Sequence, residues 1–381
     1  MDFSLTAEQD AFIERARTFG REHVGPVAAA IDEDARFPRA LVSEAASAGL
    51  LGMTLDRARG GAGVDYVAYA LAIEAIARWS ATVAVILTVT NSLVVEPLAA
   101  EGTDEQRERW LPPLVNGRAV GAFALSEDQA GSDAANQRST ARPDGAGYLL
   151  SGRKVWVANG DAADVALVFA RVDGEPREQA ITAFLVPLAE PGVSRHPLDS
   201  LGVRGLGCAD LEFSDVRLGE DARLGAVGAG WRIALDALAG GRVAIAAQAL
   251  GVGHTALDEA LAYARERQAF GQRIGDFQAI QFQLADLAAD LEAARMLMWY
   301  AADARSRGDT AAMPAAMAKL QASEAAHRAA DRAMQILASA GYQRGSRIER
   351  LFRDIRAAEI YQGTSEMQRL VIARHLIGHE V

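Results

Sequence analysis

The pattern of hydrophobic and polar positions divides the chain into a helical, a strand-rich and a second helical part. Over residues 6–110 apolar positions recur at helical spacing, as at Phe12, Ala16 and Phe19. Thr6 precedes an acidic turn, which is typical of a helix N-cap. Residues 66–95 are so uniformly apolar that one or two buried helices are expected there.

The texture of the sequence changes between residues 120 and 218. Short apolar runs rich in β-branched and aromatic residues are separated by Gly, Pro and Asp, which predicts a small β domain. The runs cover residues 148–159, 164–172, 180–188 and 209–218. Their spacing leaves no room for crossover helices, so a Rossmann sheet is not expected.

From residue 230 the pattern is helical again, and it begins with the nearly uncharged stretch "VAIAAQALGVG". Gly and Pro divide it into helices expected over residues 233–254, 257–268, 278–305, 314–337, 351–360 and 364–376. The fold class is therefore α+β and multidomain. The predicted domains are residues 1–119, all α; 120–225, β; and 226–381, α-helical.

Composition and charge narrow the class of protein. The net charge is −11, which argues against sequence-independent nucleic-acid binding. The single cysteine, Cys208, permits no intramolecular disulfide, and no metal site is expected. The N-terminal segment lacks an apolar signal core, and the apolar run at residues 82–95 is too short and polar to span a bilayer. A cytoplasmic protein without a membrane partner is predicted.

Three motifs are candidates for chemistry. "FALSEDQAGSD" at residues 123–133 is a strand end followed by a loop that presents hydroxyl and N–H groups, although a capped turn explains it equally well. "KVWVANG" at residues 154–160 places a tryptophan before a turn. "RERQAFGQRIGDFQ" at residues 265–278 has arginines around a glycine break, which suit either a phosphate or a solvated turn.

Together with "GGAG", "GRVAIAAQALG" and "RDIRAAEIYQGTSEMQR", these motifs resemble the acyl-CoA dehydrogenase family in order and spacing, over essentially the whole chain. The resemblance implies an all-α N-terminal domain, a middle β-barrel or β-sandwich domain and a C-terminal four-helix bundle. It also implies bound FAD, an acyl thioester substrate and a homotetramer built as a dimer of dimers.

The resemblance carries specific residues with it. The residues expected to contact FAD are Phe123, Leu125, Ser126, Gly131, Ser132, Trp156, Val157, Ala158, Thr364 and Glu366, with Arg267, Phe270, Gln278 and Gln335 reaching the FAD of a neighbouring subunit. The residues expected to contact the substrate are Ser132, Leu238, Gly241, Arg242 and Arg59. If Arg59 points into the acyl pocket, the acyl group is expected to be polar or anionic. The alternative is that Arg59 faces solvent.

The sequence departs from the family pattern at Gln362, the position where the catalytic glutamate usually stands. Gly363 follows it and is also expected in the catalytic site. In the family that carboxylate removes a proton from Cα while the flavin accepts hydride from Cβ. An amide has no useful basicity, and the alternative location of the base, just before Arg242, is occupied by Gly241.

Several readings stay open. The chain is an enzyme with altered chemistry, such as an oxygenase or a desulfinase-type elimination; or an ordinary dehydrogenase whose Glu was replaced by engineering; or a thioester-binding protein without activity. Ala158 stands where the family often has a hydroxyl beside the flavin, which suits the first reading. The substrate carrier is CoA or a carrier protein, and the electron acceptor is an electron-transfer flavoprotein or O2.

Overall fold

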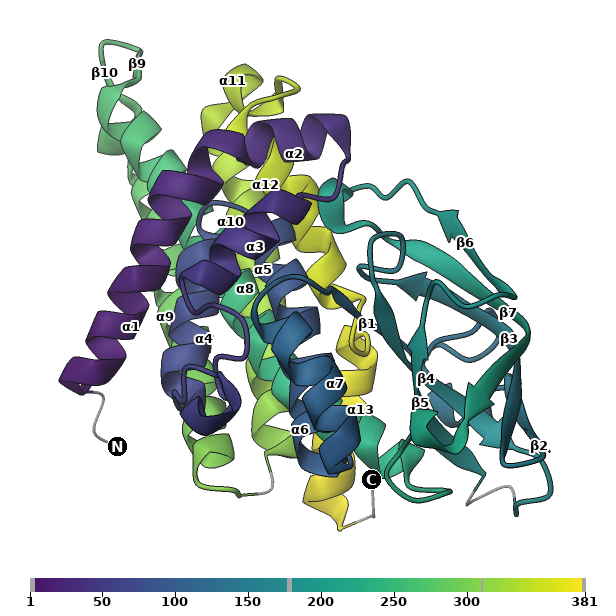
Figure 1. Ribbon diagram of the computed structural model, residues 1–381. Helices are drawn as coiled ribbons and strands as arrows, with labels where there is room; N and C mark the ends of the chain where they lie inside the picture. Colours follow the sequence, from purple (N-terminus) through teal and green to yellow (C-terminus); the bar gives the residue numbers. More distant parts are fainter. Residues whose placement is uncertain (1–3, 177–179, 310, 379–381) are drawn as a thin grey trace.

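The computed structural model describes residues 4–176, 180–309 and 311–378. Helices from both ends of the chain form one body, and the β domain packs against its side (Figure 1). This arrangement confirms the predicted sequence of a helical, a β and a second helical domain.

The N-terminal domain consists of short helices. They are α1 (Ala7–Phe19), α2 (Ala28–Asp34), α3 (Arg39–Ser47), α4 (Tyr66–Ala77), α5 (Ala81–Thr88), α6 (Glu96–Glu101) and α7 (Asp104–Val115). The predicted cap is confirmed, because the Thr6 hydroxyl accepts from the Gln9 backbone N–H while the Gln9 side chain accepts from the Thr6 N–H. Every residue of α4 and α5 is buried, as their uniform apolarity predicts.

The apolar segment that follows α4 is longer than expected. A π-helical stretch, Val89–Val95, joins α5 to α6, so the helix runs over Ala81–Glu101 and is long and apolar enough to cross a bilayer. The same holds for Gly230–Glu266. The sequence argument from insufficient length was therefore wrong. In each case 83% of the most apolar window is buried within the protein, as in a core helix.

The middle domain is one strongly curved eight-stranded sheet in the order β6-β7-β3-β2-β4-β5-β8, with β1 parallel to β4. Its strands are β1 (Gly121–Ala124), β2 (Thr140–Asp144), β3 (Gly147–Val157), β4 (Val165–Val172), β5 (Ile181–Pro187), β6 (Val193–Pro197), β7 (Ala209–Gly219) and β8 (Arg223–Leu224). All four predicted strand runs are present. A cluster of apolar side chains that includes Val94, Leu98 and Phe169 joins the sheet to the helices.

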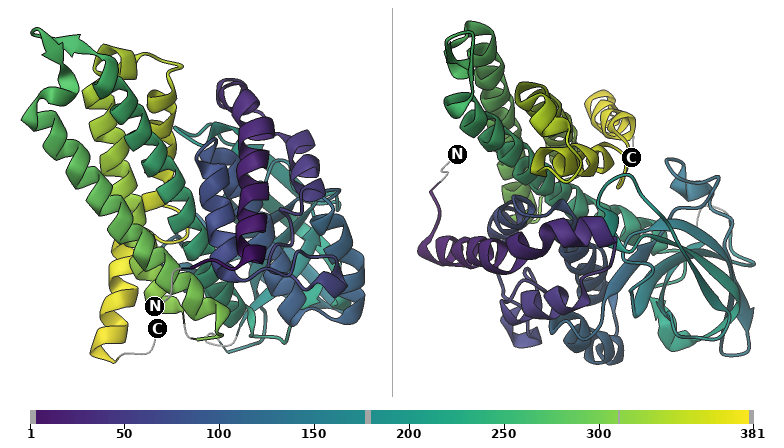
Figure 2. Two further views of the ribbon diagram at one scale, coloured as in Figure 1. Left: turned by 90° about the vertical axis from the view of Figure 1, so that its left-hand side faces the viewer. Right: turned by 90° about the horizontal axis from the view of Figure 1, so that it is seen from above.

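The C-terminal domain is built on long helices followed by shorter ones. They are α8 (Gly230–Glu266), α9 (Gln278–Ser306), α10 (Ala312–Leu337), α11 (Ser339–Tyr342), α12 (Arg347–Ile355) and α13 (Ser365–Ile377). A small hairpin, β9 (Gln268–Ala269) with β10 (Gln272–Arg273), projects between α8 and α9 at the far end from the β domain (Figures 1 and 2).

The predicted break near residue 255 is wrong, because α8 continues through it for 37 residues. Gly253 does not end the helix. Its missing side chain allows α9 and α10 to pack closely against α8. A β-carbon at Gly253 would lie 2.5 Å from Leu291 Cδ2 and 3.0 Å from the Ala326 backbone. Close packing of α9 and α10 on α8 thus outweighs the low helix propensity of glycine.

Candidate active site

Residues 123–126 and residues 154–158 of the β domain are held side by side. The backbone N–H of Val155 donates to the Ser126 carbonyl at 2.9 Å, which joins residues 123–126 to residues 154–158. Lys154, fully buried, reinforces this junction by donating to the Leu125 carbonyl at 3.1 Å and to Glu127 at 2.8 Å. Phe123, Ser126 and Ala158 are half-buried there, while Leu125 and Val157 are buried.

Trp156 is the most unusual residue of this region. It has φ of 54° and an exposed fraction of 60%, although its strand neighbours Val155 and Val157 are buried. Its backbone N–H donates to Asp210 Oδ1 at 3.0 Å, which fixes the left-handed backbone conformation. A large indole ring presented to solvent by a rigid strand end is suited to pack against a planar apolar ligand.

The loop before α13 carries the residue of greatest interest. Gln362 has φ of 52° and Gly363 has φ of 93°, so both residues are left-handed. The Gln362 side chain points at α8, since a β-carbon built on Gly241 would lie 2.2 Å from Gln362 Oε1. That oxygen is buried and has no hydrogen-bond partner among the described residues. Thr364 then caps α13 by accepting from the Met367 N–H.

Three side chains hold this loop: Lys319 and Gln368, which the sequence did not single out, and Arg242, which was expected to contact the substrate. Lys319 Nζ donates to the Gly363 carbonyl at 2.5 Å, and Gln368 Nε2 donates to the same oxygen at 2.8 Å. Arg242 Nε approaches the Gln362 carbonyl at 3.5 Å, and burial lowers the pKa of Arg242 to about 10. Only their placement on neighbouring helices in the folded chain brings these groups to one loop.

The remaining predicted residues lie as follows. Gly131 and Ser132 are exposed on a loop, and a β-carbon at Gly131 would meet nothing within 4 Å. Leu238 is half-buried on α8, and Glu366 is exposed in the first turn of α13. Arg59 is exposed and donates to the Ala99 carbonyl of α6 at 3.1 Å.

Four predicted FAD contacts do not lie beside Trp156 in this chain. Arg267, Phe270, Gln278 and Gln335 are exposed and belong to the end of the helical body that carries the β9-β10 hairpin, away from the β domain (Figures 1 and 2). Phe270 is 96% exposed and has φ of 52°. Arg267 is the C-cap of α8, so its own charge, and not a helix N-terminus, would attract a phosphate there.

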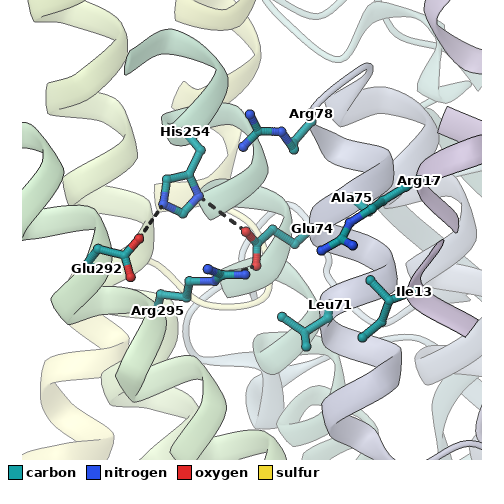
Figure 3. Close-up of a pocket in the computed structure, with 9 residues that line it drawn as sticks. All are labelled: Ile13, Arg17, Leu71, Glu74, Ala75, Arg78, His254, Glu292 and Arg295. Atoms are coloured by element: carbon teal, nitrogen blue, oxygen red, sulfur yellow. Dashed lines mark hydrogen bonds and ion pairs between the residues drawn. The ribbon is translucent and has the colours of Figure 1, made fainter. Parts of the chain in front are cut away.

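A separate cavity of about 340 Å³ lies between α1, α4, α8 and α9 (Figure 3). Its centre is Glu74, whose carboxylate lies 3.3 Å from both His254 Nδ1 and Arg295 Nε, and His254 Nε2 is 3.7 Å from Glu292. None of the predicted site residues lines it. These ion pairs join the N-terminal helix α4 to α8 and α9.

Comparison with known proteins agrees with the fold. Residues 6–118, 122–216 and 228–377 match the N-terminal, middle and C-terminal domains of acyl-CoA dehydrogenase. The chain therefore belongs to the acyl-CoA dehydrogenase family, whose members are FAD-containing enzymes.

Individual relatives cover nearly the whole chain. The human mitochondrial short-chain specific acyl-CoA dehydrogenase is 45% identical over 98% of this chain and 91% of its own. The butyryl-CoA dehydrogenase structure from Megasphaera elsdenii has a TM-score of 0.96 and 37% identity, and covers 99% of this chain and 100% of its own. The prolyl acyl carrier protein oxidase AnaB has a TM-score of 0.94 and 29% identity, with coverages of 98% and 100%.

The residues of the site fit FAD. The exposed Trp156 ring stands on the β domain, beside the junction of residues 123–126 with residues 154–158. FAD, when bound, supplies the redox chemistry. The chain itself would contribute the exposed indole ring of Trp156 and the polar groups around Gln362.

Proposed function

We propose that the protein is an FAD-dependent enzyme that acts on a short acyl-CoA thioester by a reaction in which residue 362 does not remove a proton. The observation that carries this proposal is the Gln362 side chain, which occupies the site beside Gly241 with a buried oxygen that no described group satisfies. An amide in that place can accept or donate a hydrogen bond but cannot act as a general base.

The choice of a short acyl-CoA is supported by the relatives named above. Those relatives are named for short-chain acyl-CoA and for butyryl-CoA. Because they are similar to this chain over nearly its whole length, butyryl-CoA is the first ligand to test. The similarity to AnaB supports a carrier-protein thioester as the alternative substrate. O2 and an electron-transfer flavoprotein are the two acceptors to compare.

The proposed assembly is a homo-oligomer in which a second copy completes the FAD site. Phe270 and Arg267 are exposed at the opposite end of the helical body from Trp156. A cofactor that contacts Trp156 as well as Phe270 and Arg267 would therefore have to lie between two chains. Light scattering is expected to give the mass of a tetramer in solution.

A second candidate function is ordinary α,β-dehydrogenation by a form that carries glutamate at position 362. One observation favours it. Arg242 and Lys319 both approach the Gln362–Gly363 carbonyls, and neither forms an ion pair with a carboxylate among the described residues. A glutamate at position 362 would supply the missing negative charge beside them.

The experiment is anaerobic mixing of the FAD-loaded protein with butyryl-CoA, followed by the flavin absorbance and by product analysis under O2. The variants Gln362→Glu and Gln362→Met are compared with the parent. Turnover by the parent and its loss in both variants supports altered chemistry that uses the amide. Bleaching by Gln362→Glu alone, at a rate about 10²–10⁴-fold above the parent, supports dehydrogenation.

A further inference from the structure

Lysine is almost absent from this chain. The sequence contains 39 Lys and Arg residues, and only Lys154 and Lys319 are lysines. Both side chains are fully buried. Arginine presents a broad planar fork of donors, whereas lysine places a compact charge on one atom. The only two lysines of the chain therefore stand where a compact buried charge fits.

Each lysine holds a carbonyl oxygen of a segment assigned to the active site. Lys154 donates to the Leu125 carbonyl at 3.1 Å, beside the predicted flavin contacts. Lys319 donates to the Gly363 carbonyl at 2.5 Å, one residue after Gln362. Gln362 has a left-handed conformation that is unfavourable for a residue with a side chain, and the donors on the next carbonyl, that of Gly363, hold its loop in place.

The two lysines differ in charge balance. Lys154 pairs with Glu127 at 2.8 Å, whereas Lys319 forms no ion pair with any described carboxylate. Of the acidic groups that face Lys319, Glu359 on the turn after α12 is engaged by His327 and Arg356, each at 2.7 Å, and Glu366 on α13 is exposed.

Arg242 adds a second buried cation to the same place. A β-carbon at Gly363 would lie 4.0 Å from the Arg242 guanidinium, and the Gly363 carbonyl accepts from Lys319. Burial, and then Arg242, lower the pKa of Lys319 to about 7, while Glu359 and Glu366 oppose the shift. Buried cations without a counter-charge are unfavourable, so a site that contains two of them is suited to a negatively charged ligand.

We propose that Lys319 is a positioning residue that fixes the Gln362–Gly363 backbone and, with Arg242, stabilises negative charge on an acyl thioester bound beside Gln362. The ligand class is the enolate form of a thioester. In its formation the Cα proton leaves to solvent and the C–H electron pair delocalises onto the thioester oxygen, with no oxidation. This inference rests on the proposed thioester function.

The test uses the FAD-loaded protein and acetoacetyl-CoA, a β-keto thioester whose ionisation to the enolate is followed by ultraviolet absorbance. Butyryl-CoA, which stays neutral, is the control ligand. Lys319→Met is expected to raise the pH at which bound acetoacetyl-CoA ionises by about one unit, a tenfold change in its ionisation constant. Butyryl-CoA affinity should change by less than about threefold.

Gln368→Leu is the matched control variant, because it removes a neutral donor from the same Gly363 carbonyl and leaves the Lys319 charge in place. Because Gln368 also holds this loop, Gln368→Leu should shift the ionisation of bound acetoacetyl-CoA clearly less than Lys319→Met does. Lys319→Gln can keep a hydrogen bond to Gly363 but loses the charge, so it should raise the pH of acetoacetyl-CoA ionisation as Lys319→Met does. It replaces Lys319→Met in the test if that variant does not fold.

The outcomes separate the two ideas. If the lysine variants bind acetoacetyl-CoA with an unchanged ionisation, or if Gln368→Leu shifts it equally, the role of Lys319 is overturned and the thioester function stands. If the parent binds neither CoA ester nor a carrier-protein thioester, the proposed function is overturned, and this inference falls with it.

Discussion

Gly241 and Gln362 lie so close that the glycine has no room for a side chain, since a β-carbon at position 241 would come within 2.2 Å of the Gln362 amide oxygen. The two residues are 121 positions apart in the sequence, and α8 and the loop before α13 bring them together. The orientation of the Gln362 side chain therefore depends on the absence of a β-carbon on α8.

We expect Gly241→Ala to push the Gln362 side chain aside and to weaken butyryl-CoA binding about tenfold or more, with FAD content unchanged. Overpacking of this kind costs about 1–3 kcal/mol of stability. Binding is measured by titration of the flavin spectrum. Gly253→Ala, a change at a similarly crowded glycine of α8 that faces Leu291 and Ala326, is the control.

Gly253→Ala should lower the melting temperature without changing thioester binding. Equal loss of binding in both variants would show that the effect comes from general distortion of α8, and would contradict a specific contact between positions 241 and 362.

Lys319 should make stability depend on pH. Its pKa is lowered by burial from 10.5 to about 7, so between these values the unfolded chain binds more protons than the folded one. Stability is then expected to rise with pH from about 7 to about 10.5. Lys319→Met removes this term, and at pH 7 should raise the melting temperature by a few degrees, measured by calorimetry.

A residue whose removal stabilises the fold while it weakens the active site is retained for function. The slope of stability against pH in Lys319→Met, compared with the parent, is the decisive quantity. A parallel slope in the two proteins would mean that Lys319 has an ordinary pKa and lies in a more polar environment than this structure shows.

The Glu127–Lys154 pair should be sensitive to loss of either partner. Lys154→Met leaves Glu127 buried beside residues 123–126 without a counter-charge, at a cost of about 3–5 kcal/mol. Urea unfolding measures the loss, and the ratio of flavin to protein absorbance measures FAD retention, which should fall. The double variant Glu127→Gln with Lys154→Met should recover part of the stability.

The same pair should cause acid sensitivity. Burial alone would raise the pKa of Glu127, but Lys154 and the N–H donors of Arg138 and Ser139 lower it from 4.5 to about 2. The folded pKa is depressed, so the contribution to stability is complete above pH 4.5 and is lost as the pH falls toward 2. Glu127→Gln should flatten unfolding profiles in this window.

Trp156 is expected to matter for FAD and not for the apoprotein fold. Trp156→Ala removes an exposed ring that packs on little of the protein, so the apoprotein melting temperature should stay within about 2 °C, while FAD affinity falls about tenfold or more. Leu201→Ala, a change at another exposed side chain of the middle domain, should leave FAD affinity unchanged. Equal FAD affinity in parent and Trp156→Ala would place the flavin elsewhere.

Much of the fold followed from the sequence because local signals were strong. The Thr6 cap, the four strand runs and the buried pair α4 and α5 each carry their pattern within about 20 residues. The break expected near residue 255 was wrong because glycine was taken as a helix terminator. Its neighbours on α9 and α10 use that glycine for close packing, which is information from outside the segment.

The sequence by itself determined the three domains, the motifs and the amide at position 362, because periodicity and residue identity are local properties. Only the tertiary structure decided that Gly241 faces Gln362, that Arg59 reaches Ala99 and that Lys319 holds Gly363. These relationships join residues 40 to 121 positions apart. They arise from helix packing, which fixes distances that no spacing along the chain encodes.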